Sequence, residues 1–147
     1  MALIKRAEAK NPDIPGVLCI SHGPLAGALI ESAEMIAGKF ENLASLGLEP
    51  SDSQESFKAD LEAILGELPE ETMVLVDIFG GTPCNVLMRL ANEKQKPVYA
   101  VAGMNLTMLL DVLNSRFGNT LENLFADTVK NVPSYMTNLY EVSKDLI

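Results

Sequence analysis

The chain has 147 residues, 48% of them hydrophobic, and a formal net charge of −9. This length suits one domain with a full apolar core, and the negative charge disfavours nucleic acid, whose phosphates need clustered lysines and arginines. The same charge disfavours a helix lying on an anionic membrane surface, and no apolar run approaches the roughly 20 residues that span a bilayer. Two cysteines are too few for a disulfide framework and fit a reducing, cytoplasmic setting.

Residues 1–15 carry several charges and no long apolar run, so we expect a mobile or loosely packed leader and not a secretory signal. An apolar run over 17–21 predicts a buried strand, and the Gly-Pro pair after His22 predicts a tight turn. Apolar residues at helical spacing then predict a helix over 25–37, which Gly38 ends.

A second strand is predicted over 43–48, followed by a helix whose apolar residues recur at helical spacing. Ser51 and Gln54 have the spacing of a capping box at the start of this helix, and Pro69 ends it. A third strand is predicted over 73–78, where the sequence is apolar almost throughout, as in a strand covered on both faces.

The third helix is predicted to start at Pro83 with Thr82 as its N-cap, because proline is favoured at the first helical position. A fourth strand over 98–102 is followed by a helix that Asn105 caps and Gly118 closes. Leucines at helical spacing in this helix are expected to face the core.

Asn119 and Glu122 suggest a capping box for a fifth helix, which Pro133 stops. The tail over 134–147 is too apolar to be free, so we expect it to pack against another surface. No internal repeat or low-complexity linker divides the chain, and residues 16–147 are therefore predicted to form a single domain after the leader.

The alternation of strands and helices indicates a mainly parallel sheet with helices on both faces. We predict a three-layer α/β fold whose four strands lie in the order 2-1-3-4. In that order the first and third strands are neighbours, and their carboxyl ends form the switch point where open α/β sheets bind ligands. His22 and Asp77 follow these two strands, so both side chains are predicted to lie at one crevice.

A histidine and a carboxylate at such a crevice suggest the carriage of a phosphoryl group. Asp77 can accept a hydrogen bond from one ring nitrogen of His22 and leave the lone pair of the other nitrogen exposed. The loop Gly80-Gly81-Thr82, at a helix start, offers backbone N–H groups and a hydroxyl to an anion. Each residue also has a purely structural interpretation: a satisfied histidine, a turn-capping aspartate, glycines with positive φ and a threonine N-cap.

The sequence also contains candidates for other kinds of site. Cys84, near the same helix start, is a candidate thiol nucleophile, although its sulfur is expected to point inward. One histidine and two separated cysteines predict no metal site, and no cofactor is expected. A response-regulator receiver would need acidic residues where Ser21 and His22 stand.

Three blocks of the sequence carry a resemblance: VLCISHG at 17–23, VLVDIFGGTP at 74–83 and VAGMNLTM at 101–108. Their order and spacing resemble the mannose-family EIIA domain of the bacterial phosphoenolpyruvate–sugar phosphotransferase system (PTS), over about residues 16–131. The resemblance implies that His22 takes a phosphoryl group from the histidine phosphocarrier HPr and passes it to a histidine of a cognate EIIB. By the same resemblance, Asp77 is the carboxylate that orients the ring.

The resemblance also implies which residues surround the phosphoryl group. Gly80, Gly81 and Thr82 form the phosphate-binding loop, and the expected walls of the site are Phe79, Met104 and Asn105. Such a protein meets the membrane only through its transporter subunits.

The family resemblance further implies a homodimer in which a C-terminal segment, here near 128–139, adds an antiparallel strand to the partner's sheet. A phosphotransfer subunit of a dihydroxyacetone-kinase system is the alternative that these motifs leave open. A similar domain inside a transcriptional activator is a further interpretation, but this chain has no DNA-binding segment.

Overall fold

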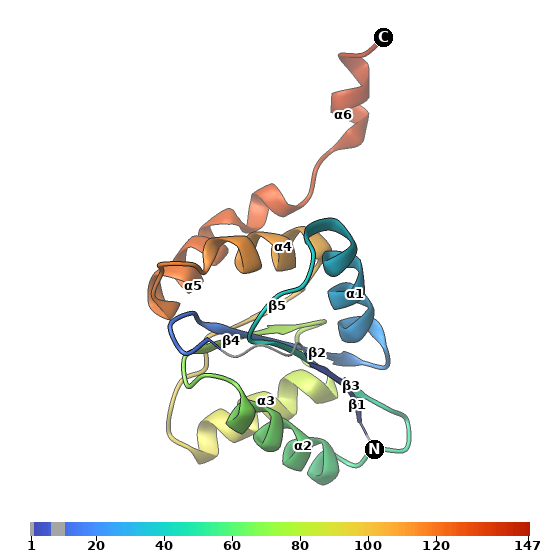
Figure 1. Ribbon diagram of the computed structural model, residues 1–147. Coiled ribbons are helices and arrows are strands. Elements are labelled where there is room, and N and C mark those ends of the chain that lie inside the picture. The colour runs from blue at the N-terminus through green and yellow to red at the C-terminus, as the bar shows by residue number, and fades with distance from the viewer. Residues whose placement is uncertain (1, 7–10) are drawn as a thin grey trace.

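The computed structural model of the protein describes residues 2–6 and 11–147. Strands and helices alternate through most of the chain (Figure 1). The strands are β1 (Leu3–Arg6), β2 (Gly16–His22), β3 (Leu43–Leu48), β4 (Thr72–Val76) and β5 (Ala100–Ala102). The helices are α1 (Leu25–Ala37), α2 (Gln54–Glu67), α3 (Thr82–Glu93), α4 (Leu106–Ser115), α5 (Leu121–Asn131), the short 3-10 helix η1 (Val132–Tyr135) and α6 (Leu139–Lys144). None of the helices in the described part of the chain has the length and apolar character that a bilayer crossing requires.

The strands form one mixed, five-stranded sheet in the order β1-β3-β2-β4-β5. Strands β3, β2, β4 and β5 run parallel, whereas β1 pairs antiparallel with β3. The parallel part has the predicted order 2-1-3-4, so the predicted fold class is confirmed. Because β2 and β4 are neighbours, the residues that follow them meet at one edge of the sheet.

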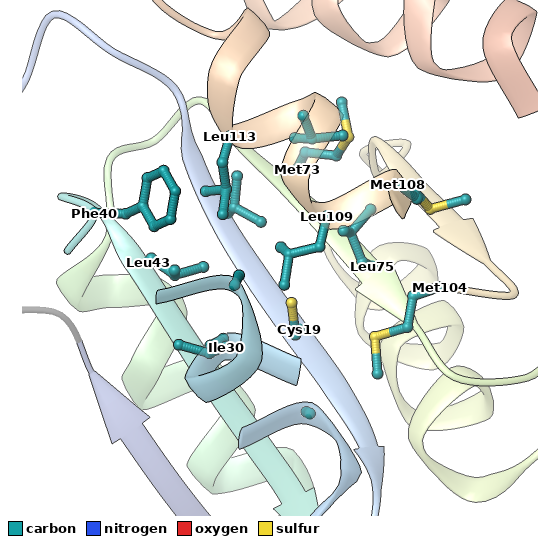
Figure 2. Packing of buried hydrophobic residues seen from close by; sticks show 14 of the residues in the cluster. Cys19, Ile30, Phe40, Leu43, Met73, Leu75, Met104, Met108, Leu109 and Leu113 are labelled. Carbon is teal, nitrogen blue, oxygen red and sulfur yellow. The ribbon is translucent and has the colours of Figure 1, made fainter. Parts of the chain in front are cut away.

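Helices cover both faces of the sheet, as the alternation of elements predicts. Figure 1 shows α1, α4 and α5 on one face and α2 and α3 on the other. Side chains of β2 alternate between these two layers: Cys19 packs among residues of α1 and α4, and Leu18 and Ile20 pack among residues of α2 and α3. Figure 2 shows the first cluster, with Cys19 and Leu75 near its centre. Burial on both faces explains the apolar run over 17–20 in β2.

The N-terminal segment contains a strand where the sequence predicts a loose leader. Strand β1 pairs with β3 along its length, because the outer edge of β3 offers unpaired backbone groups. The Lys5 ammonium lies 3.5 Å from a Glu31 carboxylate oxygen and 3.2 Å from one of Glu34, which ties β1 to α1. The expectation of loose packing is therefore wrong for β1, and also for Ile14 and Pro15, which are buried. For residues 1 and 7–10 that prediction lies outside the described residues.

The C-terminal segment is helical, so the antiparallel strand expected near 128–139 is wrong for this chain. Leu121, Leu124 and Thr128 are the buried residues of α5. Their spacing of three and four residues matches one face of a helix and not the alternation of a strand.

Tyr135 is the last buried residue of the chain, and its hydroxyl donates a hydrogen bond to the Asp111 carboxylate at 2.6 Å. This bond holds η1 against α4. Beyond it, the chain leaves the body of the molecule and α6 projects from it (Figure 1). The large apolar side chains of this tail are exposed: Met136, Leu139, Tyr140, Val142, Leu146 and Ile147. The expectation that the tail packs against another surface is therefore not met within the chain.

A buried cation ties the amino ends of the strands together. Arg116, which follows α4, is fully buried and donates guanidinium hydrogen bonds to the backbone carbonyls of Pro15, Glu41 and Asn42. Burial lowers the pKa of Arg116 to about 10, so it stays charged at neutral pH. No pattern in the sequence singled out this arginine.

Two helix starts differ from the predicted caps by one or two residues. Ser53, not Ser51, caps α2 and closes a capping box within the first turn. Thr120, not Asn119, caps α5. In each case the observed cap has the extended backbone that lets its hydroxyl reach a free N–H group. Asn105 caps α4 as predicted.

Candidate active site

His22 and Asp77 lie side by side at the carboxyl ends of β2 and β4, as their places in the predicted sheet require. His22 is the last residue of β2, and Asp77 directly follows β4. One carboxylate oxygen of Asp77, Oδ2, lies 2.7 Å from Nδ1 of His22 and accepts the His22 backbone N–H at 2.9 Å. The other oxygen accepts the N–H of Ile78 at 2.8 Å. Asp77 therefore holds both the main chain and the ring of the histidine.

The protonation of the pair follows from these contacts. Burial raises the pKa of the Asp77 carboxyl, but the hydrogen bonds from His22 and Ile78 outweigh burial and hold the pKa below its ordinary value. An ionised carboxylate only accepts hydrogen bonds, so Nδ1 of His22 is the donor in this contact, and Nε2 is the nitrogen whose lone pair is free in the neutral ring. The His22 side chain is 47% exposed, whereas that of Asp77 is 8% exposed. The ring is therefore accessible, and the acid beneath it is shielded.

Gly81 lies against the free side of the imidazole. A Cβ at this position would be 2.5 Å from Cε1 and 3.2 Å from Nε2 of His22. Gly80, just before it, has a φ of +86°, in the left-handed region that favours glycine. The two glycines therefore have different physical roles: Gly80 permits the turn, and Gly81 leaves room for the imidazole ring.

The start of α3 is arranged differently from the prediction. The sequence predicts Thr82 as the N-cap, but Gly81 occupies that position, with an extended backbone at φ −80° and ψ 172°. Thr82 is then the first helical residue, and no side chain caps the helix. An uncapped helix start leaves backbone N–H groups free to bind an anion.

The turn after His22 is held by residues that no sequence pattern singled out. The hydroxyl of Ser21, which is fully buried, accepts the backbone N–H of Ala26 at 2.9 Å. The N–H of Gly23 donates to the carbonyl of Leu48 at 2.7 Å. Together these bonds fix the path of the chain on both sides of the histidine. A lone serine at the end of an apolar strand, just before a helix, is the signal that points to such a role.

The predicted wall residues have different surroundings. Phe79 lies in the loop after Asp77 and is 86% exposed. Met104 is buried in the core cluster of Figure 2, and its N–H donates to the carbonyl of Val76 at 3.0 Å. The Asn105 side chain accepts the N–H of Met108 at 2.9 Å as the cap of α4. Phe79 alone among these residues presents a large open apolar surface.

Cys84 is buried in the core cluster that α2 and α3 cover, so its thiol is closed to a visiting substrate. This placement disfavours the thiol-nucleophile interpretation. Cys19 is buried as well, and neither cysteine forms a disulfide. Within residues 2–6 and 11–147, no group of three or more His, Cys, Asp or Glu side chains is placed to hold a metal ion.

The fold and the site define an α/β domain with an accessible histidine, paired with a carboxylate, at its switch point. Residues 16–129 match the EIIA-man family, described as "PTS system fructose IIA component", so the chain belongs to this family of sugar-uptake phosphotransferase components. This match confirms the resemblance seen in the sequence blocks. Strand β1, the last two residues of α5 and the chain beyond α5 lie outside the matched residues.

Individual relatives agree with the family. The chain is 36% identical over 110 residues to the PTS system fructose-specific EIIA component of Bacillus subtilis, covering 74% of this chain and 75% of that protein. It is 29% identical over 126 residues to the sorbose-specific EIIA component of Lacticaseibacillus casei, covering 85% and 91%. Among solved structures, the mannose/sorbose specific IIA subunit from Enterococcus faecalis is 32% identical, with a TM-score of 0.73 and coverage of 84% and 93%.

Proposed function

We propose that the protein carries a phosphoryl group on Nε2 of His22, taking it from phospho-HPr and passing it to a histidine of a cognate EIIB. The observation that carries this proposal is the hydrogen bond between Nδ1 of His22 and Asp77, which leaves Nε2 as the open nucleophile. Membership of the EIIA-man family supports the same chemistry.

The transfer exchanges one nitrogen–phosphorus bond for another. The lone pair on Nε2 of His22 attacks the phosphorus of the phosphohistidine donor, and the donor's nitrogen–phosphorus bond breaks. The donor imidazole leaves with that electron pair. As the new bond forms, positive charge develops on the His22 ring, and the Asp77 carboxylate at 2.7 Å offsets it. Passage to EIIB repeats the same exchange, with His22 as the leaving group.

The phosphoryl oxygens are proposed to face the start of α3. Backbone N–H groups of the Gly80-Gly81-Thr82 loop and the Thr82 hydroxyl are the proposed donors to these oxygens. A helix N-terminus favours an anion by about 0.3–1 kcal/mol at an exposed site, and by up to about 2 kcal/mol when partly buried. This loop lies beside Nε2, because a Cβ added at Gly81 would be 3.2 Å from that atom.

Both partners are proposed to dock around His22, because the phosphoryl group must reach each of them from the same atom. Leu25, Ile78 and Phe79 are exposed apolar side chains close in sequence to His22 or Asp77, and such side chains suit a protein interface. The net charge of −9 favours partners that present a basic face.

The proposal includes a homodimer and a cytoplasmic location. The exposed apolar tail over 136–147 is proposed to pack on a second copy of the chain, since large apolar patches mark interaction surfaces. Two buried cysteines without a disulfide fit a reducing compartment.

The test is incubation with phosphoenolpyruvate, enzyme I and HPr, followed by mapping of acid-labile phosphate and transfer to a purified EIIB. We expect one phosphohistidine, at His22, and none on His22→Gln with an unchanged unfolding temperature. Phosphate retained by that variant, or none on the wild type, overturns the proposal. Transfer to dihydroxyacetone-kinase subunits and not to EIIB would support the alternative, which the fructose- and sorbose-specific relatives disfavour.

A further inference from the structure

Asn85 lies in the first turn of α3, and its side chain reaches back to the glycine loop. The Asn85 amide Nδ2 donates to the carbonyl of Gly80 at 2.9 Å. The backbone N–H of the same residue donates to the carbonyl of Gly81, also at 2.9 Å. The second bond is the ordinary first bond of a helix, whereas the first is an additional contact. One residue thereby holds two consecutive carbonyl groups of the loop.

Holding the carbonyls also sets the direction of the N–H groups. In a planar trans peptide the C=O and the following N–H point to opposite sides, and the described residues contain no cis peptide bond. Because Asn85 holds the carbonyls of Gly80 and Gly81 on the α3 side, the N–H groups of Gly81 and Thr82 point away from the helix. Successive N–H groups of a turn directed to one side form a concavity that binds anions.

These N–H groups lie where a phosphoryl group on His22 would need them. A Cβ at Gly81 would be only 3.2 Å from Nε2 of His22, which places the backbone of the loop directly beside the proposed phosphorylation atom. We propose that Asn85 is a positioning residue that aims the Gly81 and Thr82 N–H groups at the phosphoryl group on Nε2. This inference rests on the proposed phosphorylation of His22 and adds a residue to which no role has been given so far.

If the role of Asn85 were purely structural, substituting it would change the stability of the fold and not the rate of phosphoryl transfer. Asn85 is exposed, so its loss opens no core cavity and leaves no polar group buried without water. Asn92, also exposed and near the end of the same helix, is a matched control for the same substitution. Two variants test the donor itself: Asn85→Ala removes the side-chain amide, and Asn85→Asp keeps its shape but has no N–H to donate.

The experiment measures kcat and KM for phosphoryl transfer from phospho-HPr, together with proton–nitrogen NMR spectra before and after phosphorylation. We expect Asn85→Ala and Asn85→Asp to lower kcat by roughly tenfold to a hundredfold, because misdirected donors stabilise the transferring group less well. KM should stay close to the wild-type value. Phosphorylation should shift the Gly81 and Thr82 amide protons of the wild type and of Asn92→Ala, but much less those of the Asn85 variants.

The outcomes separate this inference from the proposed function. If the wild type is phosphorylated and the Asn85 variants match Asn92→Ala in kcat and in amide shifts, the positioning role is wrong and the phosphocarrier function stands. A change in KM alone would also overturn it, since that result assigns Asn85 to partner docking. If the wild type itself accepts no phosphoryl group, the proposed function fails and this inference fails with it.

Discussion

Gly81→Ala is expected to slow phosphoryl transfer strongly while leaving the fold intact. The added Cβ would lie 2.5 Å from Cε1 of His22, against an ordinary contact of about 3.5–4.0 Å between carbons. The ring must therefore move by about 1 Å, which disturbs its hydrogen bond of 2.7 Å with Asp77. A displacement of about 1 Å can slow a reaction about 100-fold, which corresponds to an increase of about 2.7 kcal/mol in its activation free energy. The backbone angles of Gly81 are open to alanine, so the fold gains little strain.

The assay compares the rate of phosphoryl transfer from phospho-HPr with the unfolding temperature of the same variant. Gly66→Ala in α2 is the matched control, because a Cβ at that position meets nothing within 4 Å. The control should transfer at the wild-type rate and unfold at an equal or higher temperature, since alanine favours a helix over glycine. Transfer by Gly81→Ala at the wild-type rate would refute the reasoning that the missing side chain makes room for the imidazole.

Of four further predictions, two concern Asp77 and one each concerns the buried arginine and the tail. Asp77→Asn should slow transfer by roughly 10²- to 10⁴-fold, because an amide can favour the wrong ring tautomer; a normal rate would contradict this. Because hydrogen bonds lower the pKa of folded Asp77, its stabilising effect is present above the unfolded value of about 3.9 and is lost as the pH falls through the lower folded value. In urea unfolding at a series of acidic pH values, the free energy of unfolding should therefore depend less on pH for Asp77→Asn than for the wild type. An equal pH dependence of the two proteins would disprove this contribution of Asp77. Arg116→Met should lower the free energy of unfolding by about 3 kcal/mol, since buried carbonyls lose their donor, and an unchanged urea midpoint would count against that account. Removal of residues 136–147 should turn a dimer into a monomer in analytical ultracentrifugation, whereas a dimer of the shortened chain would exclude the tail as the interface.

The central sheet could be predicted because its strands are apolar on both faces and alternate with amphipathic helices. Strand β1 could not be predicted, because a four-residue segment that contains Lys5 and Arg6 is too short to show the alternation of apolar and polar residues that indicates a strand. Its pairing depends on the free edge of β3, which is a tertiary feature. The C-terminal strand was expected from the family resemblance, while the residue spacing of α5 favours a helix.

At the site, the sequence could place His22 and Asp77 together because sheet order alone determines which strand ends are neighbours. It could not assign Asn85, since the bond to Gly80 depends on the direction in which a helical side chain turns. The cap of α3 was missed for a related reason. Thr82 has the right residue type, but the extended backbone that defines an N-cap occurs at Gly81.

The Oδ2 atom of Asp77 accepts hydrogen bonds from both the ring and the main chain of His22, and this double hold has a consequence for turnover. The main-chain bond does not involve the ring, so it is the same whether His22 is phosphorylated or not. Asp77 therefore needs no new orientation between the phosphorylated and unphosphorylated states. Little reorganisation of the site then accompanies each cycle of phosphoryl transfer. We therefore expect the overall rate to be limited by association and dissociation of the protein partners.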